Sequence, residues 1–116
     1  MAGELAALLA ALKTQGTFKE LRTATDTYLE GVILREHLPA CEALLAAGLG
    51  PAAKLFGQPP KLDRTVKAAV EKLGGVRQDQ GLYFKPGADG QGMYALLWPW
   101  GSDANRVTLK VGACKL

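Results

Sequence analysis

The sequence predicts a single α+β domain over residues 1–116, helical in residues 1–75 and β in residues 76–116. Three observations predict this class: leucines at helical spacing near the start, an amphipathic stretch that stops at Gly74-Gly75, and alternating segments after it. A length of 116 residues with 48% apolar and 22% charged residues is typical of one globular domain. We expect three or four helices, then an antiparallel sheet of two or three strands.

The first half of the chain carries helical patterns. Residues 3–13 place four leucines on one side of a helix: Leu5, Leu8, Leu9 and Leu12. A second helix is expected from the capping-box sequence at Thr17–Glu20 to about Leu38. A third is expected over Pro39–Ala47, because proline is tolerated at a helix start, and one or two helical turns over Pro51–Phe56.

The second half begins with a short amphipathic helix over Leu62–Leu73. Gly81–Lys85 and Gly92–Trp98 then predict a hairpin, and Arg106–Val111 alternates as a half-buried strand does. We expect one core to hold the apolar side chains of these elements: Leu62, Val66, Ala69, Val70, Leu73, Phe84, Leu96, Val107, Leu109 and Val111.

Positive charge is concentrated in the second half of the chain. Residues 1–50 carry four cations and six anions, whereas residues 51–116 carry ten cations and five anions. A nucleic-acid contact on one side of the molecule needs such an asymmetry. An ordinary solvated surface explains it as well.

A helix that closes in Lys72-Leu73-Gly74-Gly75 is followed by the aromatic strand Leu82-Tyr83-Phe84. This order resembles the winged-helix DNA-binding modules of phage and plasmid replication proteins, over about Arg35–Trp98. The resemblance implies a non-catalytic DNA-binding module with contacts from Lys61, Arg64, Lys67, Lys72, Arg77 and Lys85. Asp89 at the expected wing tip and the additional strand Arg106–Val111 depart from that pattern.

A protein-interaction module or small inhibitor, of the kind found in phages and mobile elements, is the alternative. Its candidate interface is the face Leu5, Leu8 and Leu12, which either docks on a partner or a second copy, or covers the helical core. In Trp98-Pro99-Trp100 we expect Trp98 in the core, with its indole N–H bonded to a carbonyl, and Trp100 at an interface. Tryptophans of this kind also stack on bases.

Motifs for catalysis, cofactors and metals are missing from the sequence. His37 and Cys41 are separated by Pro39, without further ligands at suitable spacing, and the glycine-rich residues 87–92 join two strands instead of a strand to a helix. Two cysteines imply no disulfide framework. The apolar run Leu5–Leu12 is too short for a bilayer, so we expect a cytoplasmic protein without a membrane partner.

Overall fold

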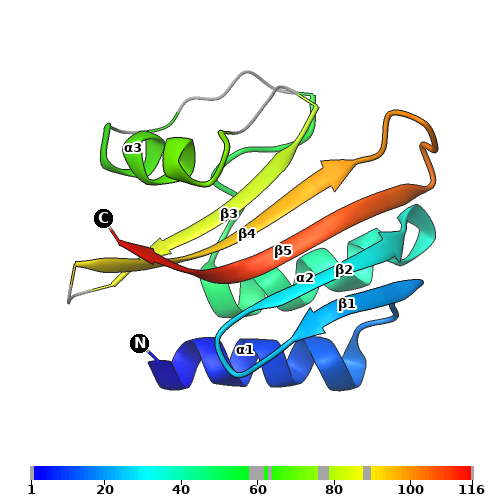
Figure 1. Cartoon of the computed structure of the whole chain (residues 1–116), viewed down its shortest axis with the longest axis horizontal. Coiled ribbons are helices and arrows are strands. Elements are labelled where there is room, and N and C mark those ends of the chain that lie inside the picture. The colour runs from blue at the N-terminus through cyan, green and yellow to red at the C-terminus, as the bar shows by residue number, and fades with distance from the viewer. Residues whose placement is uncertain (1, 58–61, 63, 76–78, 88–89, 116) are drawn as a thin grey trace.

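The computed structural model describes residues 2–57, 62, 64–75, 79–87 and 90–115. A five-stranded antiparallel sheet with the order β1-β2-β5-β4-β3 lies at its centre (Figure 1). The strands are β1 (Glu20–Ala24), β2 (Leu29–Leu34), β3 (Gly81–Pro86), β4 (Gln91–Pro99) and β5 (Arg106–Lys115). The α+β class is confirmed, but the sheet has more strands than the sequence predicted.

The described helices are α1 (Ala2–Gln15), η1 (Arg35–His37, a 3-10 turn), α2 (Leu38–Leu49) and α3 (Arg64–Lys72). The helices expected over residues 3–13, Pro39–Ala47 and Leu62–Leu73 are therefore confirmed. The division into a helical and a β part is wrong, because β1 and β2 lie between α1 and α2. None of the described helices has the length and apolar character needed to cross a membrane.

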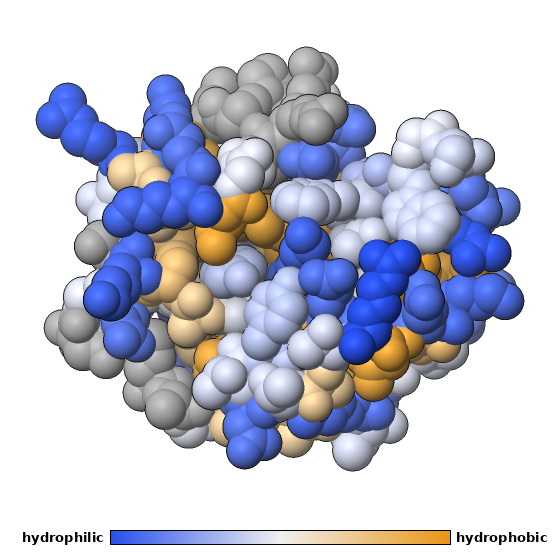
Figure 2. Space-filling view, in the orientation of Figure 1, coloured by the Kyte–Doolittle hydropathy of each residue, from blue (hydrophilic) through white to orange (hydrophobic). Residues whose placement is uncertain are grey.

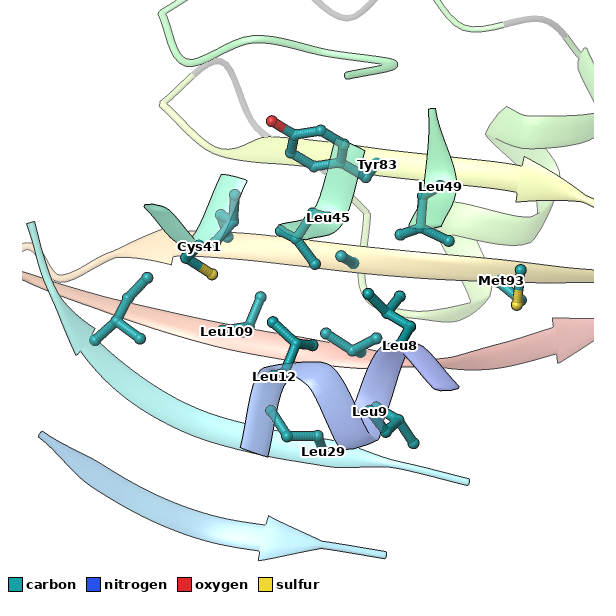
Figure 3. Close-up of a cluster of buried hydrophobic side chains, with 14 of the residues drawn as sticks. Leu8, Leu9, Leu12, Leu29, Cys41, Leu45, Leu49, Tyr83, Met93 and Leu109 are labelled. Atoms are coloured by element: carbon teal, nitrogen blue, oxygen red, sulfur yellow. The ribbon is translucent and has the colours of Figure 1, made fainter. Parts of the chain in front are cut away.

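One face of the sheet, here called the α1–α2 face, carries the main core (Figure 3). The leucines of α1 point between α2 and the strands, and Leu9 and Leu12 are fully buried. Leu45 enters this core from α2, and Leu29 and Leu109 enter it from the sheet. Alternate residues of a strand share a face, so Val107 and Val111 lie on this side with Leu109.

The opposite face, here called the α3 face, carries a second cluster. Ala69 and Val70 of α3 are buried against the strand residues Leu82, Phe84, Tyr94 and Leu96. The expectation of one core is therefore wrong, because the sheet separates this cluster from Val107, Leu109 and Val111. Two short apolar layers replace one core, as in sheets that are covered on both faces.

The largest error of sequence interpretation is the helix expected over Thr17–Leu38, which is the β1–β2 hairpin. Threonine, valine and isoleucine favour strands in this segment, and its apolar residues also fit a period of two. The turn is stabilised by Thr25, whose Oγ1 accepts hydrogen bonds from the amides of Thr27 (3.2 Å) and Tyr28 (3.0 Å). The β2 strand is completed by six residue pairs with β5.

The helical turns expected over Pro51–Phe56 are also wrong, because this segment runs beside the edge of the sheet. Lys54 and Leu82 form an isolated antiparallel bridge there. The Lys54 side chain is buried, and its Nζ donates to the carbonyls of Leu55 (3.0 Å) and Gln80 (2.6 Å). Burial lowers the pKa of Lys54. This lysine holds the segment against β3.

Candidate nucleic-acid interface

The side of α3 that points away from the sheet is cationic. Arg64, Lys67 and Lys72 are exposed, and none of them forms an ion pair with another described residue. Glu71 is the acidic residue of this helix. The buried positions Ala69 and Val70 fix the helix on the sheet, so the three cations face solvent.

Next to α3, the α3 face of the sheet continues over β5, β2 and β1. Trp98 pairs with Thr108 and Leu96 pairs with Lys110, so all four side chains lie on this face. Trp98 packs against the cluster under α3, and the Lys110 Nζ lies 4.1 Å from its ring centroid. Figure 2 shows this side of the molecule, where hydrophilic side chains surround others of intermediate hydropathy.

Trp100 is held over the same face. Its indole N–H donates to Thr108 Oγ1 at 2.8 Å, and Arg106 and Arg22 approach its ring centroid at 5.5 and 5.9 Å. These are cation–π distances. Thr108 and its cross-strand neighbour Val32 are both buried, and the hydrogen bond places the Trp100 indole at Thr108. We call Arg22, Trp98, Trp100, Arg106 and Lys110 the tryptophan cluster.

Carboxylates fix the two arginines of the tryptophan cluster. Arg22 pairs with Glu20 at 3.2 Å and with Glu30 at 3.8 Å. Arg106 pairs with Asp103 at 3.0 Å. Exposed pairs of this kind contribute little to stability. Their effect is to orient the guanidinium groups beside Trp100 and to cancel most of the local charge.

Two tyrosine side chains pack so closely on β5 that position 112 has room only for glycine. A Cβ atom at Gly112 would lie 3.0 Å from the Tyr94 hydroxyl and 3.1 Å from Tyr28 Cδ1. Tyr28 in turn donates its hydroxyl proton to Glu30 Oε1 at 2.8 Å. Two tyrosines therefore close over β5 at the point where Gly112 leaves room.

Replacing Gly112 by valine is expected to lower the free energy of unfolding by about 1–3 kcal/mol, because both tyrosines must move. The matched control is Ala113→Val, since Ala113 is the next residue of β5 and its side chain is exposed. Urea unfolding measures the free energy of unfolding of both variants, and Gly112→Val should show the larger loss. Equal stability of the two variants would contradict the close packing around Gly112.

The structure separates the residues that the winged-helix resemblance brought together. Lys85 pairs with Glu4 of α1 at 3.2 Å, on the α1–α2 side of the sheet, whereas Arg64, Lys67 and Lys72 lie on the α3 side. Lys61, Arg77 and Asp89 lie outside the described residues.

The expected interface leucines Leu5, Leu8 and Leu12 are buried inside this chain, where they form part of the main core. They cover the sheet together with α2 and are not at the surface. Trp100 is half-buried on the α3 face, where its indole bonds to Thr108. The expectation that the Trp98 indole bonds to a carbonyl is wrong, because Trp98 Nε1 is buried without an acceptor in the described part of the chain. The Trp100 indole bonds to a hydroxyl.

Sequence interpretation missed Arg22 and Lys110. A helix over residues 17–38 gives Arg22 no relation to Trp100, and only the strand assignment brings the two side chains together. Lys110 is separated by one residue from Thr108, the cross-strand partner of Trp98, and this pairing cannot be found without the register. Within the described ranges, no group of three or more His, Cys, Asp or Glu side chains is arranged to hold a metal ion.

No family model, curated protein or solved structure matches this chain. The interface is therefore interpreted from its own geometry and charge.

Proposed function

We propose that this chain is a non-catalytic nucleic-acid-binding module, with DNA as the first ligand to test. The observation that carries the proposal is the exposed side of α3, where Arg64, Lys67 and Lys72 have no acidic partner among the described residues. Cations that are not neutralised within the protein are available to phosphates, and each contact releases counterions from the nucleic acid.

The surface available to a ligand extends beyond α3. The α3 cluster extends to β5, because Cys114 of β5 packs on the apolar residues below the helix. Lys110 lies on the same face of the same strand. We therefore propose a contact surface made of α3 and the adjoining open sheet.

The winged-helix form of this proposal is supported by chain order, since the β3–β4 hairpin follows α3. Its weakness is Lys85, which should contact DNA at the base of the wing and instead pairs with Glu4. We therefore assign the phosphate contacts to α3 and not to the hairpin.

The test is the triple replacement of Arg64, Lys67 and Lys72 by alanine. Each lost phosphate contact should lower the slope of log affinity against log salt by about one, so the slope should fall by about three. Stability should change by no more than about 0.5 kcal/mol per position, because all three side chains are exposed. Fluorescence anisotropy with labelled duplex and single strands at low salt measures the slope.

The matched control removes three exposed lysines elsewhere, Lys13, Lys19 and Lys115, and so changes the net charge equally. It should keep most of the slope. An equal loss in both triple variants would show that net charge alone drives binding. Absence of binding by the unmodified chain at about 100 μM, the weak end of non-specific affinity, would end the proposal.

A protein partner is the second candidate, because a separate groove favours it. The groove has a volume of about 500 Å³ and runs between α1 and α2. Most of its lining is small or apolar: Ala7, Leu8, Ala11, Leu44, Ala47 and Gly48. This candidate would be favoured by a protein partner whose affinity does not change with salt and is lost in the Ala47→Glu variant, since a charge in an apolar contact is costly.

A further inference from the structure

The tryptophan cluster plays no part in the phosphate contacts of α3, and it differs from α3 in its charge balance. Its three cations, Arg22, Arg106 and Lys110, are matched by three nearby carboxylates, those of Glu20, Glu30 and Asp103. A surface with balanced charge releases few counterions on binding nucleic acid. If it contributes to affinity, the contribution must come from its rings.

The rings are placed for stacking. Trp98 and Trp100 are only half-buried and lie on a sheet face that α3 leaves open. The Lys110 Nζ is 4.1 Å from the Trp98 centroid, where it occupies a position over the ring. Lysine is long and flexible, and Lys110 forms no ion pair with a carboxylate among the described residues, so its side chain can move off the Trp98 ring and leave that face to a base.

The Trp100 ring has more polar contacts than the Trp98 ring. The hydrogen bond from Trp100 to Thr108 and the two carboxylate-paired arginines restrict the position of the Trp100 ring. Bases stack on aromatic rings and also on guanidinium planes. Arg22 is 40% exposed in its side chain, so its outer side is accessible to a base.

We propose that the tryptophan cluster binds unpaired bases, and that the ligand of this chain is a single-stranded nucleic acid whose backbone follows the cations of α3. The proposal rests on the proposed function and names its substrate class. Paired bases are stacked on both sides within a duplex, so a duplex offers no base face to a ring on an open sheet. The cations of α3 set the salt dependence, and the tryptophan cluster sets the preference for single strands.

The experiment compares three probes of about 16 nucleotides: oligothymidylate, an abasic strand of the same length and charge, and a duplex. The unmodified chain should bind oligothymidylate about tenfold more tightly than the abasic strand, the factor expected for a stacked base. Binding should also quench tryptophan fluorescence, since both tryptophans lie in the cluster.

Trp100→Leu should remove most of this tenfold preference while the slope against salt stays unchanged. Trp100→Phe keeps a ring and should retain most of the preference. The abasic strand is the internal control, because a variant that has lost its fold would lose affinity for this probe too. The α3 triple variant should show the opposite pattern, with a lower slope and an unchanged preference for bases.

Equal affinity for oligothymidylate and the abasic strand, or tighter binding of the duplex, would overturn the stacking proposal and leave the proposed function standing. Loss of affinity for every probe in Trp100→Leu, at an unchanged melting temperature, would also overturn it, because stacking acts only on bases. No binding of any probe would overturn the proposed function together with this inference.

Discussion

Replacing Leu109 by alanine is expected to lower the free energy of unfolding by about 2–5 kcal/mol and the melting temperature by roughly 10 °C or more. Leu109 is fully buried in β5, the central strand of the sheet, and points into the main core (Figure 3). Its removal leaves a cavity under α1 and α2 that rigid neighbours fill only in part. Chemical unfolding measured by circular dichroism checks the loss.

Leu21→Ala is the matched control, because it makes the same chemical change in β1, where Leu21 is 45% exposed. Its expected effect is within about 0.5 kcal/mol. If the two variants lose the same stability, Leu109 is not in a close-packed core.

Alkaline pH is expected to destabilise the fold by several kcal/mol. Burial, and secondarily the charge of Glu42, raises the pKa of the Cys41 thiol from 9.0 to about 12. A pKa that is raised in the folded state stabilises fully below the unfolded value, and this contribution is lost as pH rises through the folded value. Cys41 alone therefore accounts for about 4 kcal/mol between pH 9 and pH 12.

Other buried groups act in the same window. Burial also raises the pKa values of Tyr28, Tyr83 and Tyr94, so their contributions are lost at high pH as well. Lys54 acts in the opposite direction: its pKa is lowered, so its penalty disappears as pH rises toward the ordinary lysine value of 10.5. More groups are raised than lowered, so the net expectation is a loss of stability.

Cys41→Ala separates the thiol from the tyrosines. This variant should be less stable than the unmodified chain at neutral pH, because a small cavity forms, but it should lose less stability between about pH 9 and about pH 12. Urea unfolding across that range measures both curves. Parallel curves would mean that the thiol does not ionise against a burial penalty.

The parts of the fold that could be predicted from the sequence are those with one clear period. The stripe of α3 and the alternation of β5 leave little choice of structure, and α3, β3, β4 and β5 agree with their expected bounds to within a few residues. Residues 18–38 fit both periods: Phe18, Leu21, Thr25 and Tyr28 suggest a helix, while Leu29 and Ile33 share a face in a strand. Pairing of β2 with β5 selects the strand over the helix, and such long-range contacts cannot be derived from the local sequence.

The candidate site could be predicted only in part for the same reason. The cations of α3 were found because a helix face is readable from local spacing. The tryptophan cluster needs β1 and β4 to lie on either side of β2 and β5, which takes three correct strand registers, so only Trp98 and Trp100, two residues apart in sequence, could be identified in advance.

The position of β5 in the sheet has a consequence for how the chain acquires its structure. In the sheet, the β1–β2 and β3–β4 hairpins are joined by strand pairing through β5, which follows both of them in the chain (Figure 1). On a ribosome, each hairpin must therefore wait with the backbone groups of one strand edge unpaired until β5 has emerged. Pairing of β2 with β5 spans more than seventy residues, a separation that slows folding. The sheet is thus completed only when its central strand, the last of the described strands in the chain, pairs with both hairpins.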